Sequence, residues 1–191
     1  MRKKLVLITA MVCVLAMGMA ACGKADDKGN AGNSTMTAVE TLEKVWAAYS
    51  EDDKPIVMGG DAEHAVDGAP GAYAIEDVEG IESMFHITAD AVAMTDEAAS
   101  AVHAMNANTF TCSAFHLKDG SQKEDFAASV KESVLGTRWM CGFPEKLVIL
   151  SVEDEFVISA FGNGDMIELF KTKVTETYGD GAAVLADEII E

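Results

Sequence analysis

The feature of this sequence that most constrains its fold is a similarity between two of its own segments. Aligned without gaps at an offset of 46 residues, Val102–Phe115 and Val148–Phe161 are identical at five of 14 positions. Each segment is followed by a turn and then by apolar residues at helical spacing, which are Phe126, Val130 and Val134 after the first and Phe170, Val174 and Tyr178 after the second. The repeating unit is therefore predicted to be strand, tight turn, strand and helix. Chance similarity between two amphipathic hairpins is the alternative, because short β patterns are degenerate.

The two units, about residues 102–137 and 147–178, predict an α+β fold. One hairpin with one helix cannot bury its apolar surfaces. Two copies can, by joining into a four-stranded antiparallel sheet with both helices packed on one face. The second hairpin is expected to turn at Glu153-Asp154, and the first at Ala107-Asn108.

Capping residues predict where three helices begin. Thr37 with Glu40 has the spacing of a capping box, so an N-terminal helix is expected over about 38–51. Ser121 with Glu124 has the same spacing before the first helix of the repeat, and Asn163 can cap the second.

The remaining stretches have weaker patterns. Residues 54–74 are rich in Gly, Ala and Asp and predict a long loop, which in compact domains is often functional. Helical spacing indicates short helices near 77–85 and 89–100, and a last one near 180–191 that docks on the core.

The N-terminus has the pattern of a secretory leader. Residues 1–21 combine a basic start, an apolar run too short to span a bilayer and a small-residue cleavage site. Cys22 follows Ala20-Ala21 and resembles the lipidated cysteine of a bacterial lipobox. An ordinary secretory signal with an incidental cysteine is the alternative. Several acyl chains on Cys22 would anchor the chain durably at the extracytoplasmic face of the cell membrane.

Residues 22–36 are small and polar and predict a flexible tether that precedes a single domain over 37–191. Without the leader the chain keeps 11 basic residues against 32 acidic ones, a net charge of −21. Nucleic acid is therefore excluded as a partner, because binding it requires Lys and Arg to neutralise phosphates. The same charge is repelled by an anionic lipid surface, so the acyl anchor has to hold the protein there.

Three segments resemble known proteins. MGGD at Met58–Asp61, MNANTFTC at Met105–Cys112 and RWMCGFPEKL at Arg138–Leu147 resemble recurring segments of uncharacterised lipoproteins from clostridial Firmicutes. The resemblance covers most of the mature chain. It implies origin and membrane anchoring, and it implies no activity.

Two cysteines, Cys112 and Cys141, remain after the leader and Cys22. Outside the cytoplasm they could form a disulfide. Cys112 falls on the expected core face of its strand, so a buried free thiol is the other interpretation.

A Cys112/His103 pair is the sharpest enzymatic hypothesis that the sequence offers. A turn at Ala107-Asn108 would place His103 opposite Cys112 on the neighbouring strand, as a base beside a nucleophile. No third residue that would orient the histidine is evident.

The preferred function is therefore a non-enzymatic binding or scaffolding module at the cell envelope, which meets an unknown envelope protein or a small ligand. Gly59, Gly60 and Asp61 in the long loop, with Trp139 near a strand entrance, are the candidate ligand surface. No cofactor is expected, and no metal site, because the histidines and cysteines lack ligand spacing.

Overall fold

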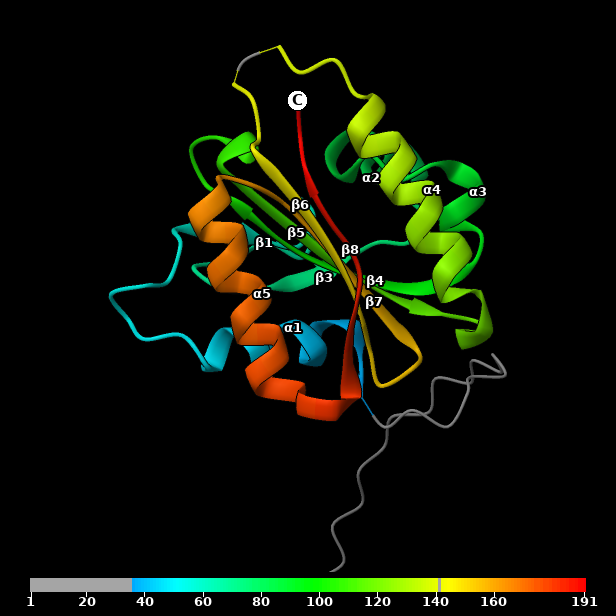
Figure 1. Ribbon diagram of the computed structural model, residues 1–191, viewed down its shortest axis with the longest axis horizontal. Helices are drawn as coiled ribbons and strands as arrows, with labels where there is room; N and C mark the ends of the chain where they lie inside the picture. The colour runs from blue at the N-terminus through cyan, green and yellow to red at the C-terminus, as the bar shows by residue number, and fades with distance from the viewer. Residues whose placement is uncertain (1–35, 141) are drawn as a thin grey trace, which may run out of the picture. The chain divides into compact units, whose positions relative to one another are not determined.

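The computed structural model describes residues 36–140 and 142–191 (Figure 1). The predicted leader, the predicted lipidation site Cys22, nearly all of the predicted tether and Cys141 lie outside the described residues.

An antiparallel sheet of eight strands organises the described chain, with the order β2-β1-β4-β5-β7-β6-β8. β3 also pairs with β4, on the same side as β1. The strands are β1 Val57–Gly59, β2 Val66–Asp67, β3 Gly71–Tyr73, β4 Thr95–His103, β5 Phe110–Leu117, β6 Lys146–Val152, β7 Phe156–Gly162 and β8 Ala182–Ile189.

Five α-helices cover both faces of this sheet (Figure 1). They are α1 Ala38–Ala47, α2 Val78–Phe85, α3 Ala89–Val92, α4 Lys123–Gly136 and α5 Gly164–Tyr178. One core lies between the sheet and α1 and α5, and the other lies between the sheet and α2, α3 and α4. No helix in the described part of the chain is both long and apolar enough to cross a bilayer.

The α+β class is confirmed, and so are several local predictions. The second hairpin turns at Glu153-Asp154, where both residues have positive φ. Asn163 caps α5 by accepting a hydrogen bond from the backbone N–H of Met166, and Thr37 with Glu40 forms the predicted capping box of α1. These features depend on short-range geometry, which local sequence specifies well.

The four-stranded sheet with helices on one face is wrong. All residues of β5 and β7 are buried, so the two central strands need cover on both sides. α4 follows β5 onto one face and α5 follows β7 onto the other. If the two units were related by a twofold axis that exchanges the antiparallel strands β5 and β7, their helices would lie on the same face of the sheet. The helices lie on opposite faces, so the predicted duplication of the whole unit is not confirmed. The near-continuous apolar runs of β6 and β7 are the sequence signal of burial on both faces.

Two predicted helices are strands. Within residues 180–191, Ala182–Ile189 form β8, which pairs with β6. Residues 95–100 belong to β4, and within 89–100 only the four residues of α3 are helical. In both places the backbone N–H and C=O groups of a neighbouring strand need hydrogen-bonding partners. Satisfying them outweighs the weak helical propensity of these residues. The long loop 54–74 also contains three short strands, β1, β2 and β3.

The Ser121–Glu124 capping box is also wrong. A 3₁₀ turn over Gly120–Gln122 precedes α4, and Asp119 caps that turn by accepting a hydrogen bond from the backbone N–H of Ser121. Gln122 is the N-cap residue of α4 and makes no side-chain capping bond.

Candidate functional site

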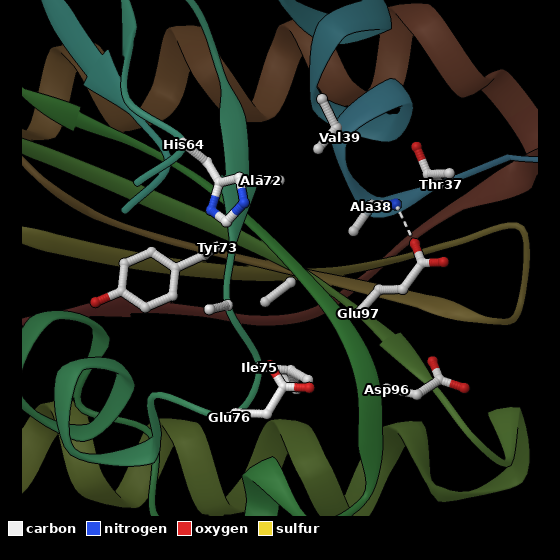
Figure 2. Close-up of a pocket in the computed structure, with 12 residues that line it drawn as sticks. Thr37, Ala38, Val39, His64, Ala72, Tyr73, Ile75, Glu76, Asp96 and Glu97 are labelled. Carbon is white, nitrogen blue, oxygen red and sulfur yellow. Dashed lines mark hydrogen bonds between the residues drawn. The ribbon is translucent and has the colours of Figure 1, made fainter. Parts of the chain in front are cut away.

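A recess lies where the start of α1 meets the segment that follows β3 and the start of β4 (Figure 2). Its volume is about 390 Å³. Figure 2 shows His64 on one side and Thr37, Ala38 and Glu97 on the other. The residues that line it are Thr37, Ala38, Val39, His64, Ala72, Tyr73, Ala74, Ile75, Glu76, Asp96, Glu97 and Ala98.

A second hollow of about 410 Å³ adjoins the first, because both are lined by Ala74 and Glu76. We call the two together the acidic recess. Six carboxylate side chains line it, and no lysine or arginine does so among the described residues. The six are Asp61, Glu63, Glu76, Asp77, Asp96 and Glu97. Carboxylates in a concave surface focus a negative potential, so the acidic recess favours positively charged ligands.

Asp61 organises the loop on one side of the acidic recess. Its carboxylate accepts hydrogen bonds from the backbone N–H groups of Glu63, His64 and Ala74, and it contacts Nδ1 of the His64 ring at 2.8 Å. Burial alone would raise the pKa of Asp61, but the bonds from Ala74, His64 and Glu63 lower it to about 2. Asp61 is therefore ionised at neutral pH and fixes the orientation of the exposed His64 ring.

Glu97 holds the opposite side of the acidic recess. Its Oε2 accepts a hydrogen bond of 3.0 Å from the backbone N–H of Ala38, in the first turn of α1. A carboxylate at this position also interacts favourably with the positive end of the helix dipole. Glu97 therefore joins the start of α1 to the start of β4.

A β-bulge in β4 brings a second carboxylate beside Glu97. Thr95 pairs with Leu117 and Glu97 with His116, which leaves Asp96 as the additional residue. The Oδ1 of Asp96 contacts Nδ1 of the buried His116 at 2.5 Å. Bulges commonly redirect side chains at functional sites, and here the bulge places Asp96 in the lining of the acidic recess.

The structure divides the candidate ligand surface into two places. Asp61 lines the acidic recess. Gly59 and Gly60 do not line it: a Cβ on Gly59 would lie 2.2 Å from the carbonyl oxygen of Ala69, and Gly60 has a φ of 76°. Both glycines therefore allow close approach of two backbone segments.

Trp139, the other predicted surface residue, lies elsewhere. Its ring packs on His86 and Phe161, with ring centroids 4.7 Å and 5.3 Å away. It belongs to the core beneath α4 and does not line the acidic recess.

The predicted pairing of His103 with Cys112 is wrong. Cys112 lies opposite Ala101, because the connection between β4 and β5 is longer than a tight turn and includes a 3₁₀ turn at Ala107–Thr109. Nδ1 of His103 accepts hydrogen bonds from the backbone N–H groups of Met105 and Asn106.

Cys112 forms no disulfide with another described residue, its side chain has no exposed surface, and burial raises the pKa of its thiol to about 12. A thiol in this environment is a poor nucleophile. The predicted Cys112–Cys141 disulfide stays a prediction, because Cys141 lies outside the described residues.

Sequence reasoning missed His64, Glu76, Asp96 and Glu97. Asp96 and Glu97 were placed in a helix rather than on a bulged strand, and the bulge itself has no clear sequence signature. The turn residues around Asp61 were visible in the sequence, but their closure onto Ala74 is a tertiary contact.

Within residues 36–140 and 142–191, no three His, Cys, Asp or Glu side chains are grouped closely enough to hold a metal ion. Comparison with protein families, curated proteins and solved structures gives no match. The resemblance to clostridial lipoproteins therefore stays an expectation.

Proposed function

We propose that this chain is a membrane-anchored, extracytoplasmic lipoprotein whose domain is a non-enzymatic binding module. Cys22 carries the lipid anchor, and the acidic recess binds the ligand. The ligand is cationic, either a small amine or a basic segment of an envelope protein.

The observation that supports this proposal is the lining of the acidic recess. Six carboxylates surround it and His64 is the one basic side chain among the described lining residues. Apolar side chains such as Val39 and Ile75 also line it. An ammonium group with an aliphatic chain complements both, because the charge meets carboxylates and the methylene groups meet apolar surface.

The position of the acidic recess also fits a tethered module. Thr37, Ala38 and Val39 line it, and these are the first residues of the domain after the predicted tether. The binding site would then lie where the domain joins its tether.

Titration calorimetry on the full-length protein tests the ligand class. The probes are spermidine and a lysine-rich peptide, with a glutamate-rich peptide as the negative control. Both cationic probes should bind. Binding should weaken about tenfold, equivalent to roughly 1.4 kcal/mol, in a Glu76→Gln/Asp96→Asn variant.

The matched control is Glu132→Gln, because Glu132 is an exposed carboxylate on α4 outside the acidic recess. It should leave binding unchanged. Equal weakening in the control would show nonspecific attraction to an acidic protein. Absence of any binding by the cationic probes would count against the proposed ligand class.

The anchor is tested by replacing Cys22 with serine and following the chain in fractionated cells. The wild-type protein should incorporate labelled palmitate and sediment with membranes, whereas Cys22→Ser should do neither. A serine variant that stays membrane-bound would contradict the proposed anchor.

The alternative of an envelope enzyme using Cys112 and His103 gains no support from the geometry. The thiol is buried in the core beneath α1 and α5, and His103 is two residues away from the register position opposite it.

A further inference from the structure

An apolar surface lies at the end of the domain opposite the acidic recess. Pairing joins Phe110 to Gly162, Gly162 to Lys146 and Lys146 to Ile189, so β5, β6, β7 and β8 all reach this end. Four apolar side chains here are largely exposed to solvent, and we call the surface that they define the apolar end. Met105 is 87% exposed, Met140 81%, Phe143 76% and Ile189 75%.

Two hydrogen bonds hold the segments of the apolar end together. Nδ2 of Asn108 donates to the carbonyl oxygen of Gly142 at 3.0 Å, which joins the β4–β5 connection to the segment before β6. The backbone N–H of Ile190 donates to the carbonyl oxygen of Glu145 at 3.0 Å, which adds the end of β8. Figure 1 shows this end of β8 beside the segment between α4 and β6. The segments that carry the four exposed side chains therefore lie next to one another.

The charge of the apolar end differs from that of the rest of the chain. Segments 103–111 and 137–144 contain no Asp or Glu, although the whole chain has 32, and the second segment carries Arg138. Acidic residues appear at the border, as Glu145 and Glu191, and beside Ile189, where Glu188 forms an ion pair with Lys131. Glu145 is engaged there, because its Oε2 accepts hydrogen bonds from Asn163 and from the backbone N–H of Gly164.

We propose that the apolar end docks on the lipid bilayer that holds the anchor. This inference rests on the proposed lipid anchor at Cys22. Exposed Met, Phe and Ile side chains insert into the boundary between headgroups and acyl chains, and a surface whose few carboxylates lie at its border is repelled less by anionic lipids than the rest of this acidic chain.

The tether is long enough for this orientation. The fourteen residue steps from Cys22 to Met36 reach up to roughly 50 Å at about 3.6 Å each. The nine residues of β4 span roughly 30 Å at about 3.3 Å each.

Docking would turn the acidic recess away from the membrane, because Asp96 and Glu97 are near the start of β4 and Met105 follows its end. The carboxylates would then face the envelope, where a cationic ligand can reach them.

Methionine oxidation footprinting of the full-length lipoprotein tests the docking. The lipoprotein is reconstituted in vesicles of phosphatidylethanolamine and phosphatidylglycerol and treated with peroxide, and the Cys22→Ser chain in solution is the reference. Met105 and Met140 should oxidise at least about fivefold more slowly in vesicles, because insertion removes them from water. Met36 and Met94, partly exposed and outside the apolar end, should keep their rates.

A Met105→Glu/Phe143→Glu variant should float with the vesicles but lose the protection of Met140. Its matched control is Val184→Glu, which replaces an apolar side chain that is 48% exposed on β8, outside the apolar end. The control should keep the protection.

The other outcomes separate the anchor from the docking. Flotation without protection of Met105 and Met140 would overturn the docking and leave the anchor intact. Failure to float would overturn both. Protection in intact cells but not in pure lipid vesicles would overturn membrane docking and indicate a protein partner at the apolar end.

Discussion

Asp61 and His64 form a fixed pair: the carboxylate of Asp61 accepts hydrogen bonds from the backbone N–H of His64 and contacts Nδ1 of its ring at 2.8 Å. The same carboxylate binds the backbone N–H of Ala74, thirteen residues further along the chain. One side chain thus closes the loop and sets the orientation of the ring beside the acidic recess.

This pair predicts a pH dependence of stability. The pKa of Asp61 is lowered from 3.8 to about 2 in the folded chain. A carboxyl group with a lowered folded pKa stabilises the protein above its unfolded pKa. Its contribution should therefore be lost as the pH falls from about 4 to about 2. The difference in unfolding free energy between wild type and Asp61→Asn should shrink over this range, as urea titrations can measure. A difference that stays constant would contradict the prediction.

Asp61→Asn should destabilise the fold at neutral pH by about 1–3 kcal/mol, because the amide cannot accept all four hydrogen bonds as an ionised carboxylate does. Chemical denaturation measures the loss. Glu63→Gln is the control, because Glu63 is exposed and only its backbone N–H takes part in this network. Equal destabilisation by the two variants would mean that the Asp61 bonds are not responsible.

Glu97→Ala should detach the start of α1 from β4. Loss of its bond to the backbone N–H of Ala38 should cost about 1 kcal/mol, and amide exchange at Ala38 should accelerate. Glu97→Gln should restore much of this protection, because its amide oxygen can still accept the bond. Exchange that remains slow in Glu97→Ala would show that the Thr37 capping box alone holds the helix start.

Gly59→Ala should destabilise the domain by at least about 2 kcal/mol, because overpacking against backbone cannot relax easily. A Cβ at this position would lie 2.2 Å from the carbonyl oxygen of Ala69 and 2.4 Å from the backbone nitrogen of Gly71. Gly136→Ala is the control, because nothing lies within 4 Å of a Cβ there. The control should be neutral or slightly stabilising in thermal denaturation. A Gly59→Ala domain as stable as the control would refute the close packing.

Cys112 should resist alkylation in the native protein. It has no exposed surface, and burial raises its pKa to about 12, so little thiolate forms at pH 8. Peptide mapping after iodoacetamide treatment should find Cys112 unmodified without denaturant and modified in guanidinium. Rapid native labelling would revive the hypothesis of a nucleophilic cysteine.

The sequence alone was sufficient for features set by neighbouring residues. The cap of α1 by Thr37, the cap of α5 by Asn163 and the turn at Glu153-Asp154 each depend on a few adjacent dihedral angles and hydrogen bonds. That Phe156 and Ile158 lie on the same face of β7 also follows from the twofold period of a strand. The α+β class followed from these local patterns.

Tertiary structure decided the rest. Residues 180–191 form a strand because β6 requires a partner along its edge, and α4 and α5 lie on opposite faces because β5 and β7 are buried on both sides. The acidic recess assembles from residues 37–39, 61–64, 72–77 and 96–98, whose proximity depends on the register of β3 and β4. The register of paired strands and the face of the sheet on which a helix packs depend on burial and hydrogen bonding summed over the whole domain. No local segment determines them.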